Sequence, residues 1–281
     1  DNVLGWDQLE PQLRDAIEAN KTTDARKFVQ YMFEPRDQKT YDVLIKDPMR
    51  WLTRQDRLPV GRNEKELVTI ALARLARSDI NVADSYLRRE WAKSMAKSNL
   101  AWIRGQYALV AALNLDSRAD DWYHEAGHIR MTEYNAGWKV RAALRQPKID
   151  WKWVIESIDQ MPQAQQQDPS WIYWKARGMA ATGRRDQANA AYASIADRFA
   201  EVRRRIHDAA LAAGRDPASV VLTAVSKTQG DAALDAALAT GQRVFGENRV
   251  QEAKVHWDER RAALPDLELR LIGPLQTNKP Q

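Results

Sequence analysis

The spacing of apolar residues divides the chain into two parts. Up to Phe199, apolar positions recur at intervals of three and four residues, and short breaks carrying Gly, Pro, Asp or Asn separate the periodic stretches. This period is typical of amphipathic helices. From Ala200 onward, short apolar runs alternate with helical stretches. The pattern changes within residues 193–205, which we call the seam, yet Ile195, Phe199 and Val202 continue one helical period through it.

The first part predicts an array of helices. Their connections are short, so neighbouring helices are expected to pack antiparallel as hairpins. Near the seam, Ala176, Gly183, Ala188 and Tyr192 have the spacing of the small and aromatic positions in a tetratricopeptide unit. The predicted fold is therefore an α-solenoid of irregular helical hairpins. The predicted helices span residues 7–19, 23–34, 37–46, 63–77, 80–96, 98–114, 117–131, 133–145, 150–160, 169–182 and 185 onward.

Tryptophan is concentrated in this helical part. Ten of the eleven Trp precede Phe199. An aromatic face can stack on a sugar ring, but a large ring at helical spacing among apolar neighbours more often fills a gap between helices. We therefore favour packing between repeats over sugar stacking.

The second part predicts a parallel β/α segment. The helix through the seam is expected to end near Ala213 and Gly214, because Gly is a common helix stop. The order of elements that follows is typical of a parallel sheet with right-handed crossovers. The chain is thus predicted to be mostly α: an α-solenoid at 1–199, then a partial, TIM-barrel-like β/α segment at 200–281. The predicted strands are 220–225, 243–246 and 268–272, and the predicted helices between them are 231–240 and 248–263.

The residues at the carboxyl ends of the predicted strands are the candidates for a site, because parallel β/α folds carry their chemistry there. They are Ser226 and Lys227, then Gly246, Glu247 and Asn248, then Gly273, Pro274, Leu275 and Gln276. A lysine that ends a buried apolar strand is partly desolvated, which favours the neutral amine that attacks an aldehyde. Lys227 is therefore a candidate for a Schiff base with pyridoxal phosphate (PLP). The alternative is a surface lysine that extends from the strand end into water.

Composition excludes several classes of site. With 44% hydrophobic and 29% charged residues, the chain can bury a core. The 43 Lys+Arg are mixed with 38 Asp+Glu, so no basic block predicts binding to nucleic acid. The absence of Cys excludes disulfides and thiolate metal sites. No apolar run approaches the ~20 residues of a membrane span, and the first residues lack the pattern of a signal peptide.

One short motif suggests zinc. His124, Glu125 and His128 satisfy the HExxH pattern, in which two histidines on one helix face bind zinc and the Glu acts as a general base. A third ligand is required, and Glu156 is the candidate for it. Gly127 has a packing role in a repeat helix, so two ordinary histidines are the favoured interpretation and no metal site is predicted.

Five segments resemble the superhelical region of soluble lytic murein transglycosylases. They are Asp121–Gly127, Trp138–Arg145, Asp150–Val154, Ile158–Pro162 and Trp171–Arg177. The resemblance covers residues 1–199. It implies a periplasmic, peptidoglycan-associated scaffold, because in that family a separate lysozyme-like domain cleaves the glycan. The Gly-Leu-Met-Gln motif of that domain is absent from this sequence, and the one matching Glu-Ser pair, Glu156-Ser157, lies in the helical part rather than in a lysozyme-like domain. No catalytic residue and no murein cleavage are therefore expected.

Three segments after the seam resemble the PLP homeostasis protein family. They are Ala224–Thr228, Gly241–Glu252 and Leu271–Lys279. The resemblance implies a cytoplasmic, non-catalytic PLP carrier with a barrel fold. It implies that Lys227 forms the Schiff base and that Asn248 lies beside the ring. This sequence holds three of the family's strands, and the later strands supply the phosphate-binding residues, so the cofactor is expected to bind weakly.

Three hypotheses remain open at this stage. The first is a composite chain with no complete active site, which joins a cell-wall scaffold to part of a PLP carrier. The second is a PLP-binding protein whose pocket is completed by a partner or a second copy. The third is a zinc hydrolase that acts through His124 and His128. The expected partners are peptidoglycan or cell-wall proteins through residues 1–199, and further copies through open sheet edges.

Overall fold

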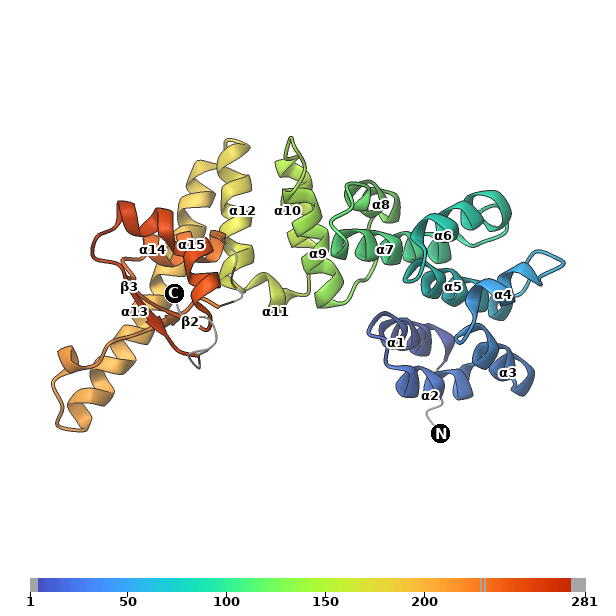
Figure 1. Cartoon of the computed structure of the whole chain (residues 1–281), viewed down its shortest axis with the longest axis horizontal. Helices are drawn as coiled ribbons and strands as arrows, with labels where there is room; N and C mark the ends of the chain where they lie inside the picture. Colours follow the sequence, from blue (N-terminus) through green and yellow to red (C-terminus); the bar gives the residue numbers. More distant parts are fainter. Residues whose placement is uncertain (1–4, 228, 230, 274–281) are drawn as a thin grey trace. The chain divides into compact units, whose positions relative to one another are not determined.

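The computed structural model describes residues 5–227, 229 and 231–273 (Figure 1). The chain forms two compact units, Asp1–Asp150 and Trp151–Gln281. The described residues of the first unit are helical throughout. Its helices are α1 (Trp6–Glu18), α2 (Thr22–Met32), α3 (Pro35–Leu44), α4 (Pro48–Thr53), α5 (Arg62–Ala76), α6 (Ile80–Tyr86), the π-helical turn η1 (Leu87–Trp91), α7 (Lys97–Leu113), α8 (Ala119–Ala126) and α9 (Glu133–Leu144).

Helices α5 and α7 form the centre of the first unit. α5 packs against α3, α4, α6 and α7, and α7 also packs against α8 and α9. Ile70 and Leu72 in α5 and Tyr107 in α7 are completely buried. Because both helices have neighbours on several sides, apolar residues occur around most of their circumference rather than on one stripe.

The second unit joins helical hairpins to a small sheet. Helix α12 packs against α10, α13 and α14. The elements are α10 (Trp151–Asp159), α11 (Gln163–Gln166), α12 (Pro169–Ala181), α13 (Arg185–Ala212), the 3-10 turn η2 (Pro217–Ser219), β1 (Ala224–Val225), α14 (Asp231–Ala239), β2 (Val244–Glu247), α15 (Val250–Ala263) and β3 (Glu268–Leu271). The predicted fold class, mostly α with a short parallel β/α segment, is confirmed.

A single helix runs through the seam, as predicted. α13 contains 28 residues (Figure 1). Ala188 before the seam and Ile195 within it are buried, and the ring of Tyr192 lies 5.8 Å from that of Tyr173 in α12. Phe199, further along the seam, packs against the apolar core beside the sheet. The compact units divide at Asp150, and α13 spans the border between the domains 1–199 and 200–281 that the resemblances define, so those domains stay a prediction.

The three strands are parallel, in the order β1-β2-β3. Ala224, Phe245 and Leu269 are aligned across the strands. All three face the core that lies against the helices, where Phe245 packs on Trp257 with ring centroids 4.5 Å apart. The remaining members of this core include Leu234, Ala237 and Leu267. Residues one position further along each strand therefore face the opposite side of the sheet.

The structure corrects four details of the predicted secondary structure. The helix predicted at 117–131 ends at Ala126, because Gly127 adopts a left-handed conformation with φ 64°. The short helices α4 and α11 were not predicted. The helix predicted at 80–96 changes to a π-helical turn and ends at Trp91. The strand predicted at 220–225 keeps only two paired residues, because its first four residues have no neighbouring strand.

No helix in the described ranges is both long enough and apolar enough to cross a bilayer.

Candidate functional site

The carboxyl edge of the sheet brings the predicted site residues together. Lys227 lies two residues after β1, Asn248 directly follows β2, and Gly273 lies two residues after β3. Because the strands are parallel, these positions meet at one edge. Lys227 and Asn248 are partly buried. The part of the third predicted segment from residue 274 onward lies outside the described residues.

Gly273 approaches the backbone of Asn248 closely. A Cβ atom added at Gly273 would collide with the carbonyl oxygen of Asn248 and would lie 3.0 Å from its Cα. A side chain at this position would therefore displace the chain after β2. Because Gly273 has no side chain, the loop that carries Asn248 can lie directly against the end of β3.

A buried carboxylate anchors the turn that precedes Lys227. Glu247 is 1% exposed. Its Oε1 accepts hydrogen bonds from Ser226 Oγ at 2.7 Å and from Trp257 Nε1 at 3.0 Å, and lies 3.4 Å from His256 Nδ1. Ser226 N also donates to the carbonyl oxygen of Gly246 at 2.9 Å. These bonds hold the backbone just before Lys227 to the end of β2.

One face of the sheet is open. Val225 aligns with Gly246, which aligns with Arg270, and these residues face away from the helix-covered core. Val225 is 52% exposed and Ile272 is 44% exposed. By the alternation of the pleat, Lys227 and Asn248 belong to this open face. The amine and the amide therefore share one edge and one face, next to exposed apolar side chains.

The HExxH motif has a different geometry from the one that its spacing suggests. The helix that carries His124 ends at Ala126, so His128 lies beyond the helix and does not share its face. Glu125 is paired with two guanidinium groups, from Arg104 at 2.7 Å and from Arg88 at 3.4 Å. Within the described residues, no group of three His, Asp or Glu side chains could hold a metal ion.

The tryptophans of the helical part pack between helices. Trp91, Trp102, Trp122, Trp153 and Trp171 are at most 8% exposed. Trp151 stacks on Trp174 with ring centroids 6.3 Å apart. The packing interpretation is confirmed for these rings.

Two polar features escaped the sequence prediction. One is the set of hydrogen bonds that Glu247 accepts, which its position at the end of an apolar run does not predict. The other is a pocket of about 550 Å³ in the first unit, lined by residues from α3, α4 and α5 and the loop between α4 and α5. Its residues are scattered over almost sixty positions, so no local motif marks it.

Comparisons with known proteins support the resemblance to PLP homeostasis proteins. No protein-family model matches the chain. The pyridoxal phosphate homeostasis protein of Pseudomonas aeruginosa is 52% identical over 88 residues, which are 31% of this chain and 36% of that protein. The Escherichia coli protein of the same name is 47% identical over 88 residues, which are 30% of this chain and 37% of that protein. The chain thus spans little more than a third of these curated relatives.

A solved structure is also similar. It is an inactive mutant of the lytic transglycosylase Slt from Pseudomonas aeruginosa, with 20% sequence identity and a TM-score of 0.46. The similarity covers 73% of this chain and 38% of that chain.

Proposed function

We propose that this chain is a composite without a complete active site. Its helical hairpins serve as a scaffold associated with peptidoglycan. Its short sheet supplies the lysine edge of a PLP site, and Lys227 is the residue that attaches the cofactor. The observation that carries the PLP proposal is the placement of Lys227 and Asn248 on one edge and one face of a parallel sheet.

The residues present fit the ring end of PLP. The cofactor supplies an aldehyde, which reacts with a neutral primary amine. Lys227 is partly buried at a strand end, and the exposed Val225 two residues before it offers an apolar surface that a flat ring can contact. Asn248 is held near this edge by the close approach of Gly273. Glu247 and Ser226 act on Lys227 only indirectly, by fixing the backbone that carries it.

Replacing Lys227 with Ala is expected to abolish covalent attachment of PLP. The full chain mixed with PLP should develop a visible absorbance band. After reduction with borohydride, mass spectrometry should find the added mass on the peptide that contains Lys227. Both signals should disappear in Lys227→Ala, because none of the other described residues at this edge carries an amine.

The matched control is Lys254→Ala, which removes an exposed lysine from α15. This variant should keep both signals. Equal labelling of many lysines, unchanged in Lys227→Ala, would contradict the proposal. If the band grows steeply with protein concentration, a second copy completes the pocket, as the exposed Val225 and Ile272 favour.

The scaffold proposal rests on the helical segments that resemble transglycosylases. Segments 121–127, 138–145 and 171–177 contribute to helices α8, α9 and α12. The full chain is expected to sediment with purified peptidoglycan sacculi and to release no anhydro-muropeptides from them. Soluble anhydro-muropeptides in the supernatant would contradict the non-catalytic proposal. Failure to sediment would contradict the scaffold.

A further inference from the structure

The pocket in the first unit combines aromatic walls with paired polar side chains. Trp51 lies partly buried at one side, and Trp91, which is 4% exposed, also lines the pocket. The indole nitrogen of Trp91 is buried and has no hydrogen-bond partner among the described residues. An unpaired buried N–H is costly, and a ligand or water that accepts from it would recover the lost bond.

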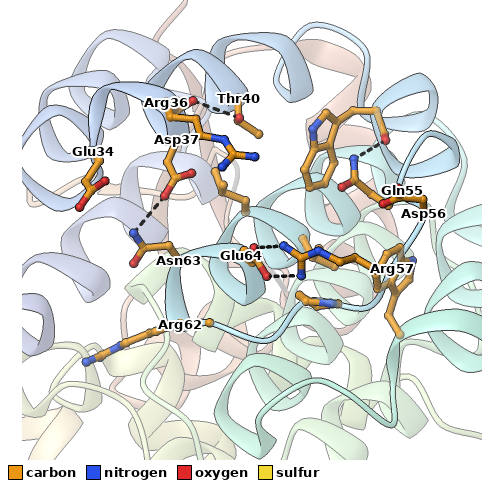
Figure 2. Close-up of a pocket in the computed structure, with 16 residues that line it drawn as sticks. Glu34, Arg36, Asp37, Thr40, Gln55, Asp56, Arg57, Arg62, Asn63 and Glu64 are labelled. Carbon is orange, nitrogen blue, oxygen red and sulfur yellow. Dashed lines mark hydrogen bonds and ion pairs between the residues drawn. The ribbon is translucent and has the colours of Figure 1, made fainter.

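Polar side chains around the pocket are already arranged in pairs. Asn63 Nδ2 donates to Asp37 Oδ2 at 3.0 Å, and Arg57 forms two hydrogen bonds with the carboxylate of Glu64 (Figure 2). The hydrogen bonds from Arg57, together with that from the backbone N–H of Val60, lower the pKa of Glu64 to about 2. Gln55 Nε2 donates to the carbonyl oxygen of Trp51 at 2.9 Å. Each arrangement fixes a planar group and leaves oxygen atoms with spare acceptor capacity.

The pocket lining carries more acidic than basic side chains. Arg57 is neutralised by Glu64, and Arg62 is held by Asp7 and Glu10. These pairs leave little positive charge to attract a phosphate or another anion. The remaining charged side chains of the lining are Arg36 and the carboxylates of Glu34, Asp37 and Asp56 (Figure 2). The lining therefore suits a neutral ligand that has many hydrogen-bonding groups.

We propose that this pocket binds a neutral saccharide. Fixed planar amide and carboxylate groups match the vicinal hydroxyls of a sugar, and the partly exposed indole ring of Trp51 provides apolar surface for its C–H face. The pocket chemistry alone points to a saccharide. The choice of a cell-wall sugar as probe rests on the proposed scaffold function.

The test is calorimetric titration of the full chain with a short chitooligosaccharide. We expect saturable binding that changes little with salt, because the ligand is uncharged. Asp37→Ala should weaken binding by about tenfold, which corresponds to ~1.4 kcal/mol. The matched control is Asp42→Ala, which removes an exposed carboxylate from the same helix, outside the pocket. It should bind as the unchanged protein does.

Trp51→Phe provides a second variant, in case Asp37→Ala disturbs α3. It retains an aromatic ring of smaller area and should weaken binding without loss of folding. Absence of chitooligosaccharide binding, or equal binding by the Asp37→Ala and Asp42→Ala variants, would overturn the inference.

Sedimentation with sacculi separates the two proposals. If the chain sediments but binds no chitooligosaccharide, only the pocket inference fails. If it binds chitooligosaccharide in the pocket but does not sediment, only the scaffold proposal fails.

Discussion

Replacing Arg14 with Ala is expected to destabilise the first unit by about 3–5 kcal/mol, since it leaves a buried carboxylate without its cation. Glu66 in α5 is 1% exposed. Arg14 Nε donates to its Oε1 at 2.9 Å and Nη2 donates to Oε2 at 2.6 Å, while Asn99 Nδ2 donates to Oε2 at 2.9 Å. The network ties α1, α5 and α7 together, so its loss affects the centre of the unit.

The size of this effect should depend on pH. Burial raises the pKa of Glu66, although Arg14 and Asn99 hydrogen-bond to it. Without Arg14 the pKa rises further. A carboxyl group whose pKa is higher in the folded than in the unfolded state favours folding as the pH falls, because the folded protein takes up the proton. The destabilisation by Arg14→Ala should therefore be larger at pH 8 than at pH 5.

Hydrogen exchange of α5 peptides measures this loss without assuming that both units unfold together. Arg26→Ala is the matched control. Arg26 pairs with Asp42 at 2.9 Å, but the two side chains are 52% and 48% exposed, so we expect a change of about 0–1 kcal/mol. If Arg14→Ala lowers the free energy of unfolding by no more than Arg26→Ala does, Glu66 is not an isolated charge in the variant. The double variant Arg14→Met, Glu66→Leu replaces both charges with apolar side chains. It should therefore recover much of the stability that Arg14→Ala loses.

Replacing Trp257 with Ala is expected to destabilise the second unit by about 3–5 kcal/mol. Trp257 is fully buried, packs on Phe245 and donates its indole N–H to Glu247. The substitution opens a cavity beneath the sheet and also removes a donor from a buried carboxylate. Peptides that cover β2 and β3 should exchange hydrogen faster, while α5 peptides should be unchanged.

Two variants refine the interpretation of Trp257. Val255 lies on the same helix but is 83% exposed, so Val255→Ala should change stability by about 0.5 kcal/mol or less. Trp257→Phe keeps most of the buried ring and loses the donor, so its cost should fall between the other two. A loss below about 1 kcal/mol for Trp257→Ala would mean that the core can close around the missing ring.

Much of the helical architecture could be predicted from the sequence, because a repeated apolar stripe determines which residues face a neighbour. The long helix through the seam is the clearest case. Ile195, Phe199 and Val202 keep one helical period where the apolar pattern changes from that of a helical array to that of a β/α segment. Short helices such as α4 and α11 contain too few turns to show a period. The end of α8 depends on the conformation of Gly127, which sequence spacing did not reveal.

The site was only partly predictable. Lys227 and Asn248 follow apolar runs, and parallel strand order brings such positions to one edge. Their proposed roles in holding PLP remain predictions. The bonds from Ser226 and Trp257 to Glu247 depend on which face each strand residue takes in the folded sheet. The pocket between α3 and α5 depends on tertiary packing, because Asp37 and Asn63 meet only after three helices have assembled.

The long helix α13 has a consequence for how the chain can change in length. Its first half packs against α12, and Ala188 and Ile195 are buried there. Its second half contacts the β/α part: Phe199 packs against the core beside the sheet, and Arg203 donates hydrogen bonds to Thr240 and Gln242. An α-helix turns by about 100° per residue. One residue inserted between Ile195 and Phe199 would rotate the second contact face by about 100° away from the first. An insertion of seven residues would restore the rotation but lengthen the helix by about 10 Å, which would separate α12 from α14, although these two helices pack together. The length of α13 between its two contact faces is therefore fixed, whereas exposed side chains in this stretch can be exchanged.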